Sequence, residues 1–177
     1  MLKKISQPAF FVVAASVAAI WQWSFIHALP SFASQFNLVL IVAVFTLFFF
    51  GFKSAAIFSL VSGFWLDLIG FNFFGLYLFS LLITIILTNW LLSSWLTNRS
   101  LYSFSFLIFI ASAVYSLILG AAFYFSTSYL EIFFLFRASF WSGLVYQSAW
   151  SVGSALVMFN LAGVATRGIK PFFLADK

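Results

Sequence analysis

From Ile5 to Leu130 the chain carries only three charged residues, Lys53, Asp67 and Arg99. Water-soluble domains carry about 25% charged residues, whereas this chain of 177 residues has 6%. A surface so poor in charge cannot face water, and the stretches between the charges are long enough to form helices that cross a bilayer. The pattern therefore predicts an all-α, polytopic membrane protein whose whole length, 1–177, forms one integral-membrane domain.

The predicted fold is a compact bundle of about six transmembrane helices. Each crossing needs about 20 mostly apolar residues. The predicted spans cover residues 8–29, 36–50, 54–69, 73–96, 101–125 and 139–164. The second and third spans are short, so we expect them to tilt little or to thin the bilayer locally. The first exceeds the roughly 7–15 apolar residues of a signal peptide, and we interpret it as a retained span.

The positions of the basic residues predict the orientation of the bundle. Six spans put both termini on one side of the membrane. That side then carries seven of the eight basic residues: Lys3, Lys4, Lys53, Arg99, Arg167, Lys170 and Lys177. Lys and Arg concentrate on the cytoplasmic side of membrane proteins, so both termini are predicted to be cytoplasmic.

Several classes of function are disfavoured by what the sequence lacks. The chain has no cysteine and a single histidine, His27, which removes thiol chemistry and most metal sites. The basic residues are scattered between apolar runs, so they do not form a patch for nucleic acid. We find no paired carboxylates, no nucleophile with a base and no glycine-rich phosphate loop. We therefore expect no enzyme, no cofactor and no metal.

The most informative stretch surrounds Asp67, with Gly63 before it and Gly70 and Gly75 after it. A charged group at the centre of a membrane helix costs about 2.5–3.5 kcal/mol, so Asp67 should face protein or water. An acid near the C-terminus of its own helix opposes the helix dipole, which makes it a poor simple cap. The alternatives are a role in the fold or in a partner contact, and a proton or cation site. Gly70 and Gly75 fit a tight reversal, where positive φ or close backbone contact is needed.

Small residues spaced by four predict close packing of helices. Three such faces are Ala14 and Ala18, Ala55 and Ser59 leading to Gly63, and Ser112, Ser116 and Gly120; Ala149 and Gly153 form a fourth. In lipid, helices associate through such faces and through buried polar groups. We expect packing within the bundle, with a helix of another protein as the alternative occupant. The isolated amides Gln22, Asn89, Gln147 and Asn160 are expected to form hydrogen bonds between helices.

The stretch from Gly63 to Leu78, GFWLDLIGFNFFGLYL, resembles the motif of the MreD family of rod-shape-determining membrane proteins. The shared features are a glycine, an aspartate four residues later, a short turn, and a Gly-Leu-aromatic start to the next helix. The length and the helical, loop-poor composition are similar over the whole chain.

This resemblance implies a non-catalytic subunit of the cell-wall elongation machinery in the bacterial cytoplasmic membrane. It implies an MreC-like single-span protein as the main partner. Indirect partners would be an MreB-like filament, a glycosyltransferase of the shape/division type and a transpeptidase. Gly63, Asp67, Gly70 and Gly75 would then shape a hairpin on the external side that organises the bundle.

The alternative is a substrate-binding subunit of an energy-coupling-factor transporter, which carries small molecules such as vitamins. Such subunits resemble this chain in length and helix number, and they dock through alanines spaced by four on the first helix, as Ala14 and Ala18 are. They also need a polar external pocket. Gln22, His27, Asp67, Asn72 and Glu131 would have to converge to form it.

The predicted topology is tested by labelling introduced cysteines, because the natural chain contains none. Cysteines replacing Lys3, Arg99 or Lys177 should resist an impermeant maleimide added to intact cells, and a cysteine replacing Ser128 should react. Reaction at position 99 in intact cells would contradict the six-span topology.

Overall fold

The computed structural model describes residues 2–26, 36–70, 74–94, 101–126 and 138–166. Within these ranges the chain is helical almost throughout, and no strand occurs. The helices are α1 (Leu2–Trp21), continued by a π-helical turn η1 (Gln22–Ile26), α2 (Leu38–Phe50), α3 (Phe52–Gly70), α4 (Leu76–Ser94), α5 (Leu101–Ser126) and α6 (Ala138–Thr166). The prediction of an all-α fold is confirmed for this part of the chain.

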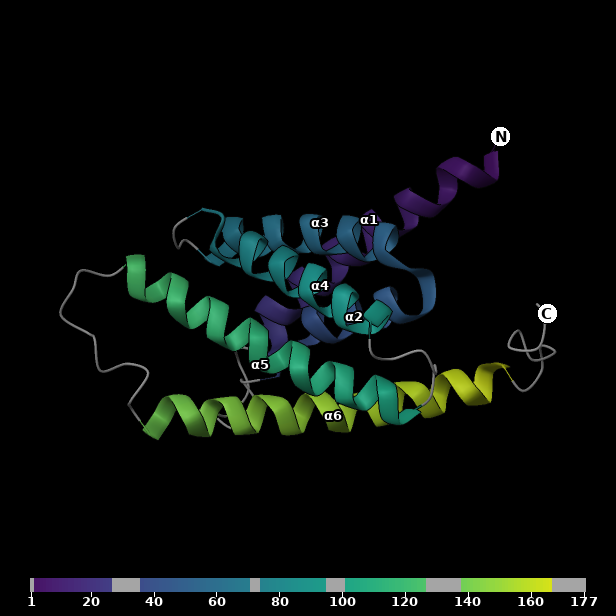
Figure 1. Cartoon of the computed structure of the whole chain (residues 1–177). Coiled ribbons are helices and arrows are strands. Elements are labelled where there is room, and N and C mark those ends of the chain that lie inside the picture. The colour runs from purple at the N-terminus through teal and green to yellow at the C-terminus, as the bar shows by residue number, and fades with distance from the viewer. Residues whose placement is uncertain (1, 27–35, 71–73, 95–100, 127–137, 167–177) are drawn as a thin grey trace.

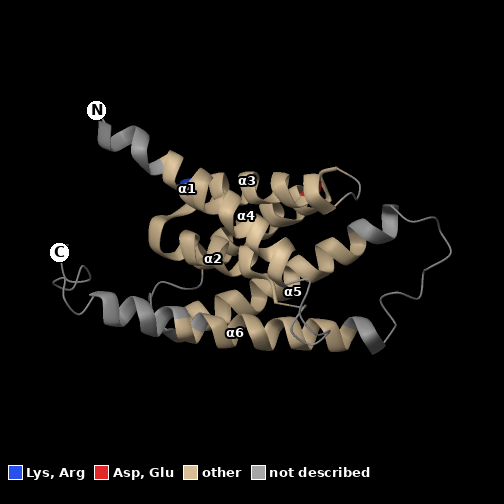
Figure 2. Ribbon diagram, turned by 180° about the vertical axis from the view of Figure 1, so that it is seen from behind, with Lys and Arg blue, Asp and Glu red and all other residues tan. Residues whose placement is uncertain are grey.

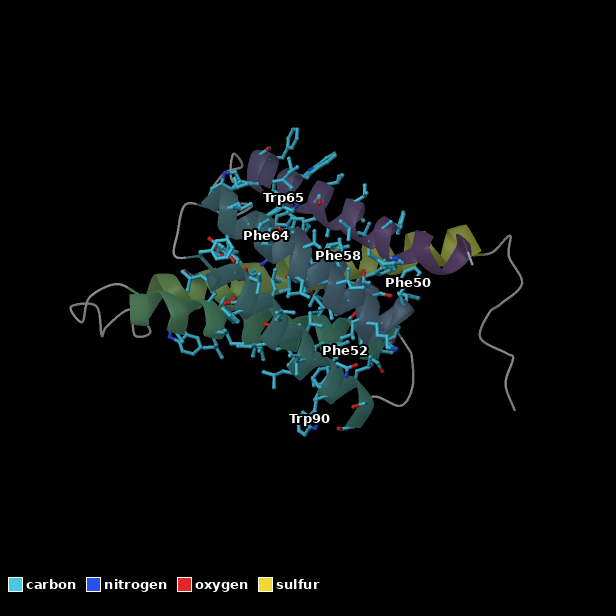
Figure 3. All side chains as sticks on the ribbon, turned by 90° about the horizontal axis from the view of Figure 1, so that it is seen from above. Phe50, Phe52, Phe58, Phe64, Trp65 and Trp90 are labelled. Atoms are coloured by element: carbon cyan, nitrogen blue, oxygen red, sulfur yellow. The ribbon has the colours of Figure 1, made fainter. Side chains whose placement is uncertain are left out.

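Four of the described helical stretches are long and apolar enough to cross a membrane. They are Pro8–Phe25, Phe52–Gly70, Leu76–Ser94 and Tyr102–Ala121. Large apolar side chains also cover the outside of the bundle: Trp90, which points away from the end of α4 in Figure 3, is 62% exposed. These features are those of a membrane protein. The number of crossings and the side on which the termini lie stay predictions.

The short helix α2 occupies the centre of the bundle and contacts all five other helices. Twelve of its 13 residues are apolar, and eight of the 13 are buried, which is the pattern of a largely buried helix. At 1.5 Å per residue it is about 20 Å long, less than the roughly 30 Å of a hydrocarbon core. Because protein surrounds α2, its shortness does not require the lipid around it to thin.

A tight turn joins α2 to α3. Gly51 has φ +84° and donates its N–H to the carbonyl of Leu47 at 3.2 Å, and α3 begins at the next residue. Glycine adopts this left-handed conformation without the steric penalty that a Cβ would bring. The long apolar run is therefore divided into α2 and α3 by Gly51, a residue that can be identified from the sequence.

Phenylalanines fill the contact between α2 and α5. The rings of Phe48 and Phe104 lie 5.1 Å apart, and those of Phe45 and Phe104 lie 6.0 Å apart. From α3, Phe58 is fully buried within the bundle (Figure 3). Part of the high phenylalanine content therefore serves the core, and the rest covers the outer surface.

The outer helices are arranged around α2 (Figure 1). α3 packs against α1, α2 and α4; α5 packs between α4 and α6; and α6 lies at the edge of the bundle beneath α5. Among the residues coloured in Figure 2, the charged ones are Lys53 and Asp67. They lie at opposite ends of α3, and Asp67 is beside the turn that leads to α4.

α3 and α4 are in close backbone contact at Gly63. A Cβ added to Gly63 would lie 2.6 Å from Leu78 Cα and 3.2 Å from Leu78 N. Both atoms belong to the backbone, so a rotamer change cannot relieve the clash. The spacing of α3 and α4 therefore requires glycine at this position.

We predict that Gly63→Ala lowers the midpoint of thermal unfolding in detergent, because α3 and α4 must move apart. Gly153→Ala on α6 is the matched control, since no atom lies within 4 Å of its added Cβ. Alanine is favoured over glycine in a helix by about 1 kcal/mol at either site, so the comparison isolates the clash. Overpacking costs about 1–3 kcal/mol. Equal midpoints for the two variants would contradict the close approach.

Candidate functional site

Asp67 connects the end of α3 to the start of α4. It lies in the last turn of α3 and is 3% exposed. Its Oδ1 accepts a hydrogen bond from the backbone N–H of Tyr77 at 2.9 Å, and its Oδ2 accepts one from the N–H of Leu78 at 3.1 Å. These are the second and third residues of α4, and the first-turn N–H groups of a helix have no partner within it. The carboxylate therefore caps α4 from across the hairpin.

This geometry explains an acid that looked poorly placed in the sequence. At the C-terminus of α3 the helix dipole opposes a negative charge, but at the N-terminus of α4 the dipole favours one. Asp67 belongs to α3, but its carboxylate caps the N-terminus of α4. Both carboxylate oxygens are engaged by backbone donors, so the arrangement holds the two helices in a fixed register.

Gly75 explains why the cap comes from another helix. It precedes α4 and its carbonyl accepts the first helical hydrogen bond, from the N–H of Phe79 at 2.8 Å, so it occupies the N-cap position. An N-cap residue usually supplies a side-chain oxygen to the first turn, and glycine has none. Its φ of +102° also disfavours a residue with a Cβ. Asp67 supplies the missing acceptor.

The other two glycines of the motif have different surroundings. Gly63 lies one turn before Asp67 and allows Leu78 to reach the carboxylate, as the close approach described above requires. Gly70 is the last residue of α3, and it is not among the described glycines with positive φ. Of the two glycines expected at the reversal, only Gly75 adopts the left-handed conformation in the described part of the chain.

The start of α2 is capped in a related way at the same end of the bundle. The N–H of Val39 donates to Gln22 Oε1 at 2.8 Å, and the N–H of Leu40 donates to Asn37 Oδ1 at 3.0 Å. Gln22 comes from η1, whereas Asn37 directly precedes α2. We call Gln22, Asn37 and Asp67 the capping layer. All three side chains are at most 7% exposed.

Two residues at this end were not identified from the sequence. Asn37 lies immediately before the apolar run of α2, which is the typical position of an N-cap residue, so its role could have been predicted from the sequence. Tyr115 on α5 is 3% exposed and forms a hydrogen bond with the Asn37 side chain. No local pattern marks Tyr115, because its partner is distant in sequence.

The three principal small-residue faces lie inside the chain's own bundle. Ala18, Ala55, Ser59 and Ser112 are between 0% and 9% exposed, Gly120 is buried, and Ala14 and Ser116 are partly buried. On α5, Ser112 and Ser116 form side-chain hydrogen bonds to α6. Another protein's helix cannot reach these residues without displacing a helix of this chain. On α6, by contrast, Ala149 and Gly153 are exposed.

The residues required for a carrier pocket are only partly described. Gln22 and Asp67 both cap helices whose N-termini lie at one end of the bundle, but their oxygens bind backbone N–H groups of this chain. His27, Asn72 and Glu131 lie outside the described residues. Within the described ranges, no three His, Cys, Asp or Glu side chains come together in a way that could hold a metal ion.

Comparisons with protein-family models, with curated proteins and with solved structures found no match to this chain. The class of protein that the fold and the site define is a helical membrane-type bundle with a carboxylate-capped hairpin.

We predict that Asp67→Asn unfolds at a lower temperature than the wild type and that Asp67→Leu unfolds lower still. Asparagine keeps one oxygen for one of the two N–H groups, whereas leucine leaves both buried donors without an acceptor. Each unsatisfied buried donor costs about 1–3 kcal/mol. Thermal unfolding of the purified variants in detergent measures the order, and wild-type midpoints for both variants would show that Asp67 is incidental to stability.

Proposed function

We propose that this chain is a non-catalytic membrane subunit of the MreD type, located in the bacterial cytoplasmic membrane. It acts by binding a single-span protein of the MreC type. Through that partner it is linked to an MreB-like filament, a shape/division-type glycosyltransferase and a transpeptidase. The topology that belongs to this proposal has both termini in the cytoplasm.

The observation that carries the proposal is the geometry of the motif that resembles MreD. Gly63, Asp67 and Gly75 are separated in sequence but act on one structural unit, the α3–α4 hairpin. A motif in which Gly63, Asp67 and Gly75 build a hairpin supports a scaffold role, because its carboxylate already accepts hydrogen bonds from two backbone donors. The same commitment disfavours proton or cation chemistry at Asp67.

The buried small-residue faces change where the partner contact should be sought. Ser59 is fully buried beside Gly63 on α3, so a bulky residue there would disturb the chain's own packing. Loss of partner binding by such a variant would not identify the contact. The partner is expected on a surface that this fold leaves exposed.

The carrier alternative receives less support. It needs polar side chains with free hydrogen-bonding capacity at the external end. Of the residues proposed for that pocket, the two that are described use side-chain oxygens to cap α2 and α4. No described contact favours a small-molecule site over a structural one.

We predict that the chain co-purifies with the MreC-type protein encoded in the same genome when the two are expressed together and extracted in mild detergent. An unrelated single-span protein of similar length serves as the control and should not be retained. The chain must elute as a single species alone and in the complex, so that aggregation is not mistaken for binding.

Two outcomes would contradict this function. One is a well-folded, monodisperse chain that does not retain the MreC-type protein. The other is saturable quenching of its seven tryptophans by a vitamin at micromolar concentration, which would favour the carrier.

A further inference from the structure

The helix order brings the scattered basic residues of this chain towards one end of the bundle. α1, α3 and α5 begin at this end, and α4 and α6 finish there (Figure 1). The hairpin between α3 and α4, which Asp67 caps, is at the opposite end. We call the first of these two ends the basic end.

Seven of the eight basic residues belong to helix ends at the basic end or to chain segments that follow those helix ends. They are Lys3 and Lys4 at the start of α1, Lys53 at the start of α3, Arg99 between α4 and α5, and Arg167, Lys170 and Lys177 after α6. Of the three acids in the chain, only Asp176 belongs to the same set. The basic end therefore carries a large excess of positive charge, although no local sequence motif contains it.

Lys53 is the basic residue at this end whose side chain the structure describes. It is exposed and lies in the first turn of α3. Asp67, the acid whose side chain is described, lies at the other end of the same helix, about 21 Å away at 1.5 Å per residue (Figure 2). Among the described residues Lys53 therefore has no acid to pair with, and its charge is available to an anion from outside the chain.

Exposed aromatic side chains lie at the basic end as well. Phe50 and Phe52, on either side of the turn before Lys53, are 58% and 41% exposed. Trp90, about one turn from the end of α4, is 62% exposed, and Tyr102 in the first turn of α5 is 86% exposed. Figure 3 shows the rings at positions 50, 52 and 90. Tryptophan and tyrosine collect where lipid headgroups meet the hydrocarbon, so this combination indicates that Lys53 lies at the level of the headgroups.

The aromatic rings favour a lipid over an acidic soluble protein as the source of the anion. A lysine side chain keeps its apolar stem against apolar surface and its charge at the polar boundary. An anionic lipid presents a phosphate to that charge and acyl chains to the rings in the same molecule. An acidic segment of a soluble protein complements the charge alone. Anionic lipids attract basic segments next to a membrane in this way.

We propose that the basic end binds anionic lipid headgroups, with a lipid phosphate at Lys53 and the acyl chains of the same lipid against Phe50 and Phe52. The other basic residues at this end add attraction for further anionic lipids. This inference does not rest on the proposed function, because it requires a membrane-embedded bundle with a basic end and no partner protein.

Quenching by brominated lipids tests the proposal. A bimane fluorophore is attached to a single introduced cysteine, since the natural chain has none. The test position is Phe50, three residues before Lys53, and the control position is Phe74, which is 65% exposed beside the hairpin at the other end. The protein is reconstituted into phosphatidylcholine vesicles that contain an equal share of either brominated phosphatidylglycerol or brominated phosphatidylcholine.

At position 50 we expect the phosphatidylglycerol to quench at least about twice as strongly as the phosphatidylcholine, because lysine near the membrane surface attracts anionic lipid. At position 74 the two lipids should quench equally. Raising the salt concentration should lower the preference at position 50, since salt screens exposed charges. The comparison does not depend on the direction in which the protein inserts, because both leaflets contain the same lipids.

Substitutions at position 53 provide the second arm. Lys53→Gln removes the charge from an exposed side chain and should lower the preference for phosphatidylglycerol at position 50 by about half or more. Lys53→Arg is the matched control and should keep the preference, because arginine also binds phosphate. Equal midpoints of thermal unfolding for the two variants verify that both are folded.

Four results would overturn the proposal. One is equal quenching by the two lipids at position 50, and another is the same preference at positions 50 and 74. A third is a preference that Lys53→Gln leaves unchanged, because the lipid would then not be bound at Lys53. The fourth is a change in bimane emission on adding polyglutamate when brominated phosphatidylglycerol shows no preference, since the anion would then come from a protein.

Discussion

The first N–H groups of a membrane helix need acceptors, and in the hydrocarbon region water does not supply them. At the start of α4 this requirement falls on Asp67, because Gly75 occupies the N-cap position and has no side chain. For the carboxylate to reach Tyr77 and Leu78, α3 and α4 must lie close together, and a glycine at position 63 permits that approach. One acid and two glycines therefore fix the register and spacing of the hairpin.

The same requirement accounts for the rest of the capping layer. The N-terminus of α2 is buried among the other helices, and Gln22 and Asn37 supply its acceptors. Its apolar sides are covered by five helices, and they form the centre of the core. α6 is outside this scheme. It is joined to α5 through serine and glutamine side chains.

The fold class followed from the sequence because long apolar runs with few charges leave a chain few alternatives. The break at Gly51 and the tight turn near Gly75 could also be predicted, because glycine favours positions where positive φ disfavours a side chain. The role of Asp67 was not readable. Its donors come from the next helix, whereas its position in the sequence indicates only the dipole of its own helix. The small residues at Ala55 and Ser59 predicted close packing, but which helix covers them depends on the packing of the whole bundle, which no local pattern contains.

The most direct test of the cap across the hairpin is residue-resolved amide hydrogen exchange at Tyr77 and Leu78. First-turn amides of a helix normally lack a protein acceptor. In the wild type we expect both amides to exchange as slowly as that of Ile85 in the middle of α4. In Asp67→Leu both should exchange faster, while Ile85 keeps its wild-type rate. Fast exchange of Tyr77 and Leu78 in the wild type, or rates that Asp67→Leu leaves unchanged, would contradict the cap.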